Sequence, residues 1–123
     1  MKLILIVEDK ESSRELLRTV LEKQGYKVEE AENGEQALEK VRDAIPDLVL
    51  LDLQLPIRDG YEVLREIRKN PATAKTPVVA VTANAMQGDR ERALEAGFTS
   101  YIAKPVSLAY LREEVTRLLG SNK

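Results

Sequence analysis

The sequence contains no cysteine and no histidine among its 123 residues. Their absence excludes disulfide frameworks, zinc sites built from thiolate or imidazole ligands, and catalytic triads that need an imidazole base. Any chemistry performed by this chain must therefore come from carboxylates, lysine, hydroxyl groups or a bound hard cation.

The sequence also lacks a charge excess of one sign and a long apolar run. Nineteen Lys and Arg residues nearly balance 21 Asp and Glu residues, which gives a formal net charge of −2. We therefore expect no direct binding to nucleic acid through charge alone. The apolar run at residues 3–7 is too short for a signal peptide or a membrane span, so we expect a cytoplasmic protein without a membrane anchor.

Five segments have the composition of β-strands. Four of them are apolar without alternation, as in parallel strands that are covered on both faces, and they lie at residues 3–7, 48–51, 78–81 and 101–103. The segment 27–31 mixes apolar and charged residues and indicates an edge strand. Hydrophobic residues make up 43% of the chain, enough for one packed domain.

Helical spacing of apolar residues alternates with these strands. The apolar stripes are Leu16, Leu17, Val20 and Leu21; Ala37, Leu38 and Val41; Val63, Leu64 and Ile67; and Leu108, Leu111, Val115 and Leu118. Residues 85–96 have few large apolar side chains and predict the most loosely held helix. Asp59 and Gly60 predict a turn followed by a helix start.

Strand and helix in strict alternation predict an α/β fold, a doubly wound three-layer sandwich with a parallel sheet.

Polar side chains stand where the predicted strands end. Glu8 and Asp9 follow the first strand, Asp52 the third, Thr82 the fourth and Lys104 the fifth, and such ends meet at one rim of a doubly wound sheet.

Three carboxylates there would repel one another by about 4 kcal/mol per close pair at an effective dielectric constant of about 20. Oxygen ligands without His or Cys favour Mg²⁺. A hard cation, a lysine, a hydroxyl and a spare carboxylate suit phosphoryl transfer to the carboxylate.

Four short motifs at these strand ends carry a family resemblance. They are Glu8-Asp9, residues 52–60 (DLQLPIRDG), residues 81–85 (VTANA) and residues 101–105 (YIAKP). Together they resemble the receiver domain of bacterial two-component response regulators, of the single-domain type similar to the chemotaxis regulator. The resemblance implies a flavodoxin-like fold with a five-stranded parallel sheet in the order 2-1-3-4-5. It also implies a receiver domain over residues 1–120 and a short tail at 121–123.

The resemblance assigns roles in phosphoryl chemistry to the acidic residues. It implies that Asp52 is the phosphoacceptor and that Asp9, Asp52 and the backbone carbonyl of Gln54 bind Mg²⁺, for which Mn²⁺ can substitute. Glu8 would act on the cation through a water molecule. In this sequence Glu8 replaces the more usual Asp, and Lys10 places a cation directly after the acidic pair.

The resemblance also assigns the phosphoryl-binding and switch residues. Thr82 and Lys104 would bind phosphoryl oxygens, and the peptide bond between Lys104 and Pro105 would be cis. Thr82 and Tyr101 would form the switch that reports phosphorylation to the face of the fourth helix, fifth strand and fifth helix.

The resemblance also implies that two variable positions of the family influence how long the acyl phosphate survives. In this sequence they are occupied by Gln54 and Asn84.

The resemblance further implies a signalling module that catalyses its own phosphorylation and dephosphorylation but is not a turnover enzyme. Because the chain has no histidine, the phosphohistidine donor must be a partner, either a sensor histidine kinase or a histidine phosphotransfer protein. We expect a downstream protein target, and a monomer or a weak phosphorylation-dependent dimer. A free-standing regulator is expected, with the receiver part of a longer hybrid kinase or regulator as the alternative.

Three other functions fit parts of the pattern. An aspartyl-phosphate phosphatase or phosphotransferase usually has a second acid two residues after its nucleophile, where this chain has Gln54. A flavin-binding module needs a Ser, Thr and Gly-rich phosphate loop after the first strand, but residues 8–11 (EDKE) would repel a phosphate. The third is a receiver-like scaffold that no longer accepts phosphate, although the acid, hydroxyl and lysine set is complete.

Overall fold

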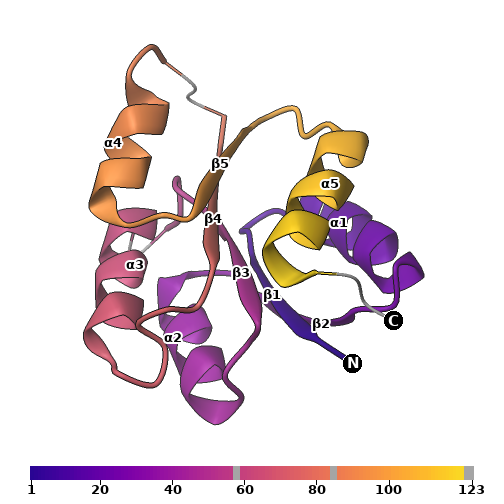
Figure 1. Ribbon diagram of the computed structural model, residues 1–123, viewed down its shortest axis with the longest axis horizontal. Coiled ribbons are helices and arrows are strands. Elements are labelled where there is room, and N and C mark those ends of the chain that lie inside the picture. The colour runs from indigo at the N-terminus through magenta and orange to yellow at the C-terminus, as the bar shows by residue number, and fades with distance from the viewer. Residues whose placement is uncertain (57–58, 84–85, 121–123) are drawn as a thin grey trace.

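The computed structural model describes residues 1–56, 59–83 and 86–120, and in this part strands and helices alternate (Figure 1). The strands are β1 (Leu3–Val7), β2 (Lys27–Ala31), β3 (Leu48–Asp52), β4 (Val78–Thr82) and β5 (Ser100–Ala103). The helices are α1 (Glu11–Lys23), α2 (Gly34–Asp43), α3 (Gly60–Lys69), α4 (Asp89–Ala96) and α5 (Leu108–Leu119). None of the helices in the described ranges is long and apolar enough to cross a membrane.

All strand pairs are parallel, and the sheet has the order β2-β1-β3-β4-β5. The doubly wound, flavodoxin-like α/β fold is therefore confirmed. Strand β2 lies at one edge, as its mixed composition predicts, and β5 lies at the other. The strand order reverses between β1 and β3, and ligand sites of such folds lie beyond the carboxyl ends of the strands at this point.

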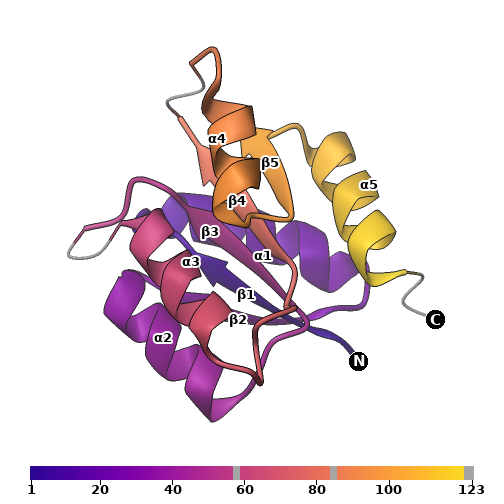
Figure 2. The same cartoon turned by 60° about the vertical axis from the view of Figure 1, so that its left-hand side comes forward.

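The helices cover both faces of the sheet, with α1 and α5 on one face and α2, α3 and α4 on the other (Figures 1 and 2). Each face has its own hydrophobic cluster. In β1, for example, Ile4 and Ile6 pack towards α1 and α5, while Leu5 and Val7 pack towards α2 and α3. Successive side chains of a strand point to opposite faces, so a strand covered on both faces is apolar throughout.

The element boundaries differ from the prediction in two informative ways. Strands β3 and β4 extend by one residue and end at Asp52 and Thr82, because the ladder continues through the pairs Asp52 with Val81 and Thr82 with Ala103. The polar residues are thus held by the sheet itself.

The fourth helix is shorter than predicted. Its predicted start at Ala85 lies outside the described residues, and α4 begins at Asp89 after Gly88, whose positive φ of 88° interrupts helical geometry. Ala93 is the one buried residue of α4, whereas each of the other helices buries at least two. This sparse burial agrees with a loosely held helix.

Side chains on β5 and α5 fix the far edge of the sheet. Ser100 donates a hydrogen bond of 2.6 Å to Glu114, which also pairs with Arg117 at 2.8 Å. The hydrogen bond from Arg117, opposed by partial burial and reinforced by Ser100, lowers the pKa of Glu114 to about 2. Glu114 therefore stays ionised and ties α5 to β5.

The start of α3 packs directly on the end of β3. The helix starts at Gly60 as predicted, and Asp59 caps it, because its carboxylate accepts a hydrogen bond of 3.0 Å from the amide of Glu62. A Cβ atom on Gly60 would lie 2.9 Å from the carbonyl oxygen of Asp52 and 2.9 Å from the Cα of Leu53. Only glycine allows this approach without a backbone shift.

We predict that Gly60→Ala lowers the free energy of unfolding by about 1–3 kcal/mol, because the added methyl group must displace the backbone at Asp52 and Leu53. Urea denaturation measures the change. Arg65→Ala, on the exposed side of α3, is the control and should change stability by no more than about 0.5 kcal/mol. Equal stability of Gly60→Ala and the wild type would contradict this account of the α3 start.

Candidate functional site

The carboxyl ends of the strands bring the predicted polar residues to one rim. Glu8 and Asp9 follow β1, Asp52 ends β3, Thr82 ends β4, and Lys104 follows β5. The Glu8 amide donates a hydrogen bond of 3.0 Å to β2, and the Lys104 amide one of 2.8 Å to the carbonyl of Thr82. The backbone hydrogen bonding of the sheet therefore continues into the residues that form the site.

The ammonium group of Lys104 joins the two buried acids. Its Nζ donates to Oε2 of Glu8 at 2.7 Å and to Oδ2 of Asp52 at 3.2 Å. Glu8 is 2% exposed and Asp52 is 3% exposed, while the Lys104 side chain is 23% exposed. Two desolvated carboxylates are thus paired with one cation that reaches them from the solvent side.

Burial and nearby charges shift the pKa values of Glu8 and Lys104. Burial raises the pKa of Glu8, and the negative charge of Asp52 adds to this, although the hydrogen bond from Lys104 partly opposes it. Burial alone would lower the pKa of Lys104, but the hydrogen bonds and charges of Glu8 and Asp52 together raise it above its usual value. Lys104 therefore stays protonated near neutral pH.

Asp9 completes an acidic cluster at the rim. One carboxylate oxygen from each of Glu8, Asp9 and Asp52 lies within 4.8 Å of the others. A single ammonium group cannot compensate three carboxylates, and the donor atoms are all oxygens. This donor set fits a hard divalent cation such as Mg²⁺.

Gln54 links Asp52 to the end of β4. Its backbone amide donates to Oδ1 of Asp52 at 2.9 Å, and its side-chain Nε2 donates to the hydroxyl of Thr82 at 2.7 Å. The side-chain oxygen of Gln54 accepts a hydrogen bond of 3.2 Å from the amide of Ala83. The family resemblance identifies Gln54 as a variable position, but it does not predict this bridge.

Tyr101 lies away from the acidic rim. It pairs with Ala80 in the sheet, two residues before Thr82, and packs in the same cluster as Ala93 and Phe98 beneath α4. Its hydroxyl is buried without a hydrogen-bond partner in the described ranges. Burial chiefly, with the nearby charge of Asp89, raises the pKa of Tyr101.

Of the remaining predicted site features, the structure describes the Lys104–Pro105 peptide bond but not Asn84. The peptide bond between Lys104 and Pro105 is cis. Asn84 lies outside the described residues, as do Ile57, Arg58 and Ala85 of the sequence motifs.

Sequence reasoning missed Arg14, a buried residue of α1 whose Nη1 donates to the backbone carbonyl of Glu8 at 2.8 Å. A signal was present, because Arg14 occupies the same helical stripe as the core residues Leu17 and Leu21. An arginine at a core-facing position one turn after the acidic pair indicates a buried polar contact.

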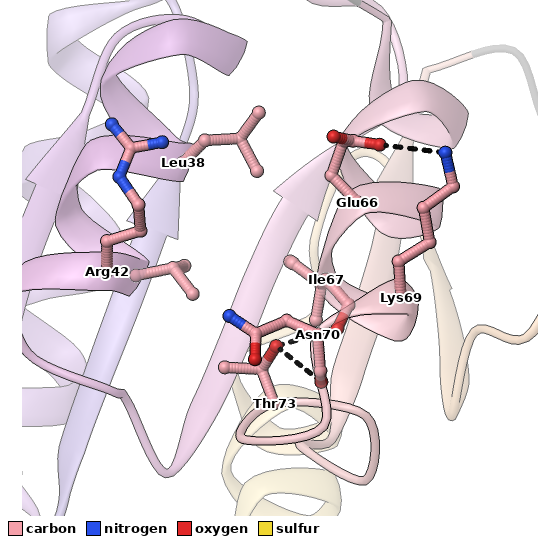
Figure 3. A pocket seen from close by; sticks show the side chains of 8 residues that line it. Leu38, Arg42, Glu66, Ile67, Lys69, Asn70 and Thr73 are labelled. Atoms are coloured by element: carbon pink, nitrogen blue, oxygen red, sulfur yellow. Dashed lines mark hydrogen bonds and ion pairs between the residues drawn. The ribbon is translucent and has the colours of Figure 1, made fainter.

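Two pockets of similar volume lie at different places on the molecule. One, of about 250 Å³, adjoins the rim and is lined by Glu8, Ser13, Leu16, Leu17, Val81, Lys104, Pro105 and Val106. The other, of about 270 Å³, lies between α2 and α3 (Figure 3) and contains none of the rim residues. Two of its polar contacts are internal, with Lys69 3.3 Å from Glu66 and the Thr73 hydroxyl donating to the Ile67 carbonyl at 2.6 Å. The first hollow is therefore the one that belongs to the site.

Comparison with known proteins agrees with this geometry. The chain is 40% identical over 119 residues to the polar-differentiation response regulator DivK of Brucella anthropi, with 97% of each chain covered. It resembles the receiver domain of the sensor histidine kinase PA1611 of Pseudomonas aeruginosa, whose structure has a magnesium ion coordinated in the active-site cleft, at 39% identity and a TM-score of 0.88, covering 98% of each chain.

A third similar protein is the chemotaxis response regulator CheY4 of Vibrio cholerae, at 28% identity and a TM-score of 0.90, covering 97% of this chain and 99% of that one. Residues 4–116 match the response regulator receiver domain family. The chain therefore belongs to the response regulator receiver domain family of two-component systems.

Proposed function

We propose that this receiver domain accepts a phosphoryl group on Asp52 from a phosphohistidine of a partner protein, in a reaction that requires Mg²⁺. The observation that carries the proposal is the position of the Asp52 carboxylate. It is buried at a strand end, paired with Lys104 at 3.2 Å, and within 4.8 Å of carboxylate oxygens from Glu8 and Asp9. A sensor histidine kinase or a histidine phosphotransfer protein is the donor, because this chain has no histidine.

The residues at the rim have different roles in the phosphoryl transfer. One carboxylate oxygen of Asp52 attacks phosphorus while the bond from phosphorus to the donor imidazole breaks, and the imidazole nitrogen takes up a proton. Lys104 and Thr82 bind the oxygens of the transferred group. The reaction modifies the protein itself, so the module is a switch and not a turnover enzyme.

The cation site consists of Asp9, Asp52 and the backbone carbonyl of Gln54, with Glu8 acting through water. When bound there, Mg²⁺, or Mn²⁺ in its place, neutralises charge on the phosphoryl oxygens. The oxygen-only donor set supports this assignment. The magnesium ion in the PA1611 receiver supports it as well.

The switch begins at Thr82, whose hydroxyl accepts a hydrogen bond from Gln54 in this structure. To bind a phosphoryl oxygen on Asp52, that hydroxyl must turn its single donor proton towards Asp52, which changes its contact with the Gln54 side chain. Gln54, together with Asn84, thereby influences the lifetime of the acyl phosphate. Tyr101, buried with an unpaired hydroxyl among the described residues, responds to the displacement and alters the face of α4, β5 and α5 for a downstream protein.

The hollow beside the rim is the surface on which the donor docks. A donor imidazole must reach Asp52, so its protein must cover the adjoining surface, and Glu8 and Lys104 line both the site and the hollow. Leu16, at 52% exposed, contributes an apolar side chain there. A helix of the donor that carries apolar residues next to its histidine fits this surface.

The receiver comprises residues 1–120, and the tail at 121–123 lies outside the described residues. We propose a cytoplasmic regulator that is monomeric or forms a weak dimer when phosphorylated. The alternative is a receiver within a longer hybrid kinase or regulator, and the 39% identity to the receiver of the sensor kinase PA1611 supports it.

Incubation with acetyl phosphate and Mg²⁺ should increase the intact mass by one phosphoryl group, and Asp52→Asn or removal of Mg²⁺ by EDTA should abolish the gain. Asp59→Asn is the matched control, because this exposed aspartate lies outside the cluster, and it should be modified like the wild type. Modification that persists in Asp52→Asn would refute the assignment. Continuous release of phosphate at enzymatic rates would favour the phosphatase function.

Lys104→Met should lower the free energy of unfolding by about 2 kcal/mol, because two buried carboxylates lose their charged hydrogen-bond donor. Added Mg²⁺ should recover part of this loss by neutralising the acids. Urea denaturation with and without Mg²⁺ measures both effects. Lys69→Met, which breaks an exposed ion pair with Glu66, should cost no more than about 1 kcal/mol, and an equal cost for both variants would contradict the role of Lys104.

Leu16→Asp should slow transfer from a phosphorylated protein donor about tenfold, equivalent to about 1.4 kcal/mol, and leave modification by acetyl phosphate unchanged. Ile45→Asp is the control, since Ile45 is 51% exposed but precedes β3 at the opposite end of the sheet. Time courses of phosphoryl transfer supply the rates. Equal rates for the two variants would place the donor elsewhere.

A further inference from the structure

Arg14 is a buried guanidinium group close to the acidic cluster. It lies in α1 and is 7% exposed, although arginine is rarely buried unless its charge is paired. Its Nε donates to Oε1 of Glu30 at 2.9 Å, and its Nη2 lies 3.5 Å from Oε1 of Glu32. These two acids, on and just after β2, fix the plane of the guanidinium group.

The third contact of Arg14 reaches the backbone of a predicted site residue. Its Nη1 donates to the carbonyl oxygen of Glu8 at 2.8 Å, and this hydrogen bond is buried. The amide of Glu8 donates to the carbonyl of Ala31 at 3.0 Å. Both polar backbone groups of Glu8 are therefore held, one by β2 and one by Arg14.

The held carbonyl belongs to the peptide plane that joins Glu8 to Asp9. Because that plane is rigid, fixing the carbonyl also fixes the direction in which the chain enters Asp9. The carboxylates of Glu8, Asp9 and Asp52 repel one another at their short separation. This repulsion favours movement of the β1–α1 connection away from Asp52, and the hydrogen bond from Arg14 opposes it.

We propose that Arg14 is a positioning residue of the divalent cation site: it holds the Glu8–Asp9 pair where three carboxylates share one cation. The inference rests on the proposed function, which places the cation among these acids. Arg14 itself does not contact the cation. Contacts of this kind behind metal ligands commonly change metal affinity 10- to 100-fold.

If Arg14 acted only through its charge, its removal would strengthen the binding of the divalent cation, which is the opposite of the effect expected for a positioning residue. Loss of a positive charge near the acids makes the surroundings more negative and strengthens the binding of a divalent cation. If Arg14 instead holds the Glu8–Asp9 pair in place, its removal weakens the binding of the cation. The sign of the change in Mg²⁺ affinity therefore separates the two effects.

Arg18 provides a matched control on the same helix. It also pairs with Glu30, and it pairs with Glu22 at 3.2 Å and contacts the carbonyl of Val28 at 3.4 Å. Its contacts within the described ranges lie on the edge strand β2 and on α1 itself, and they do not include Glu8. Arg18→Met thus removes the same charge and the same kind of network contact without freeing the acid pair.

The test is calorimetric titration of the unphosphorylated proteins with MgCl₂, at a temperature where thermal melts show each variant to be folded. Arg14→Met should raise the dissociation constant for Mg²⁺ about 10- to 100-fold, while Arg18→Met should leave it unchanged or lower it. Arg14→Lys keeps one donor for the Glu8 carbonyl and should give an intermediate value. If Arg14→Met does not fold, the test uses Arg14→Lys, for which we expect a smaller rise in the dissociation constant for Mg²⁺.

An unchanged or lower dissociation constant in folded Arg14→Met, or in Arg14→Lys where only that variant folds, would overturn the positioning role and leave the cation site intact. A reduced melting temperature with unaltered Mg²⁺ affinity would likewise identify Arg14 as a purely structural residue. If the wild type itself does not bind Mg²⁺, the proposed cation site fails, and the inference fails with it.

Discussion

The contact between one ammonium group and two buried carboxylates organises this molecule. Lys104 follows the edge strand β5, yet its Nζ reaches Glu8 after β1 and Asp52 at the end of β3. Both acids are desolvated at 2–3% exposure, and burial of a charged group is costly unless a partner of opposite charge compensates it. The strand order places β1 and β3 side by side, and the carboxyl ends of parallel strands at one rim bring the lysine within reach. The fold therefore creates the charge cluster, which Lys104 partly compensates and which is compatible with the binding of Mg²⁺.

Much of this arrangement follows from sequence alone, since the relevant signals are local. Apolar runs without alternation identify strands covered on both faces, and the mixed composition of residues 27–31 identifies the edge strand β2. The charged or hydroxyl residues that end those runs, including Asp52 and Thr82, are conspicuous against apolar neighbours. In a parallel sheet, strand ends of this kind must converge, so the acidic rim can be predicted without coordinates. The four short motifs made the family recognisable.

The rest could not be predicted because it depends on contacts between distant residues. The bridge from Gln54 to Thr82 spans 28 positions, and no local pattern shows that a glutamine side chain will turn towards the next strand. The carbonyl of Glu8 gives no sequence signal for its contact with Arg14, although an arginine in a core-facing stripe is a hint. Helix α4 begins later than the helical periodicity predicts, because Gly88 has a positive φ and the periodicity of this segment is weak. These contacts adjust the rim, while the pattern of the strands determines that it exists.

The most direct test of the account is a crystal structure of the protein with Mg²⁺ and beryllium trifluoride, which mimics a phosphoryl group on a carboxylate. The account predicts beryllium on Asp52, with fluorine atoms contacting Lys104 and Thr82. It also predicts the cation among Asp9, Asp52 and the Gln54 carbonyl. Beryllium on a different carboxylate, or a cation bound away from these oxygens, would contradict it.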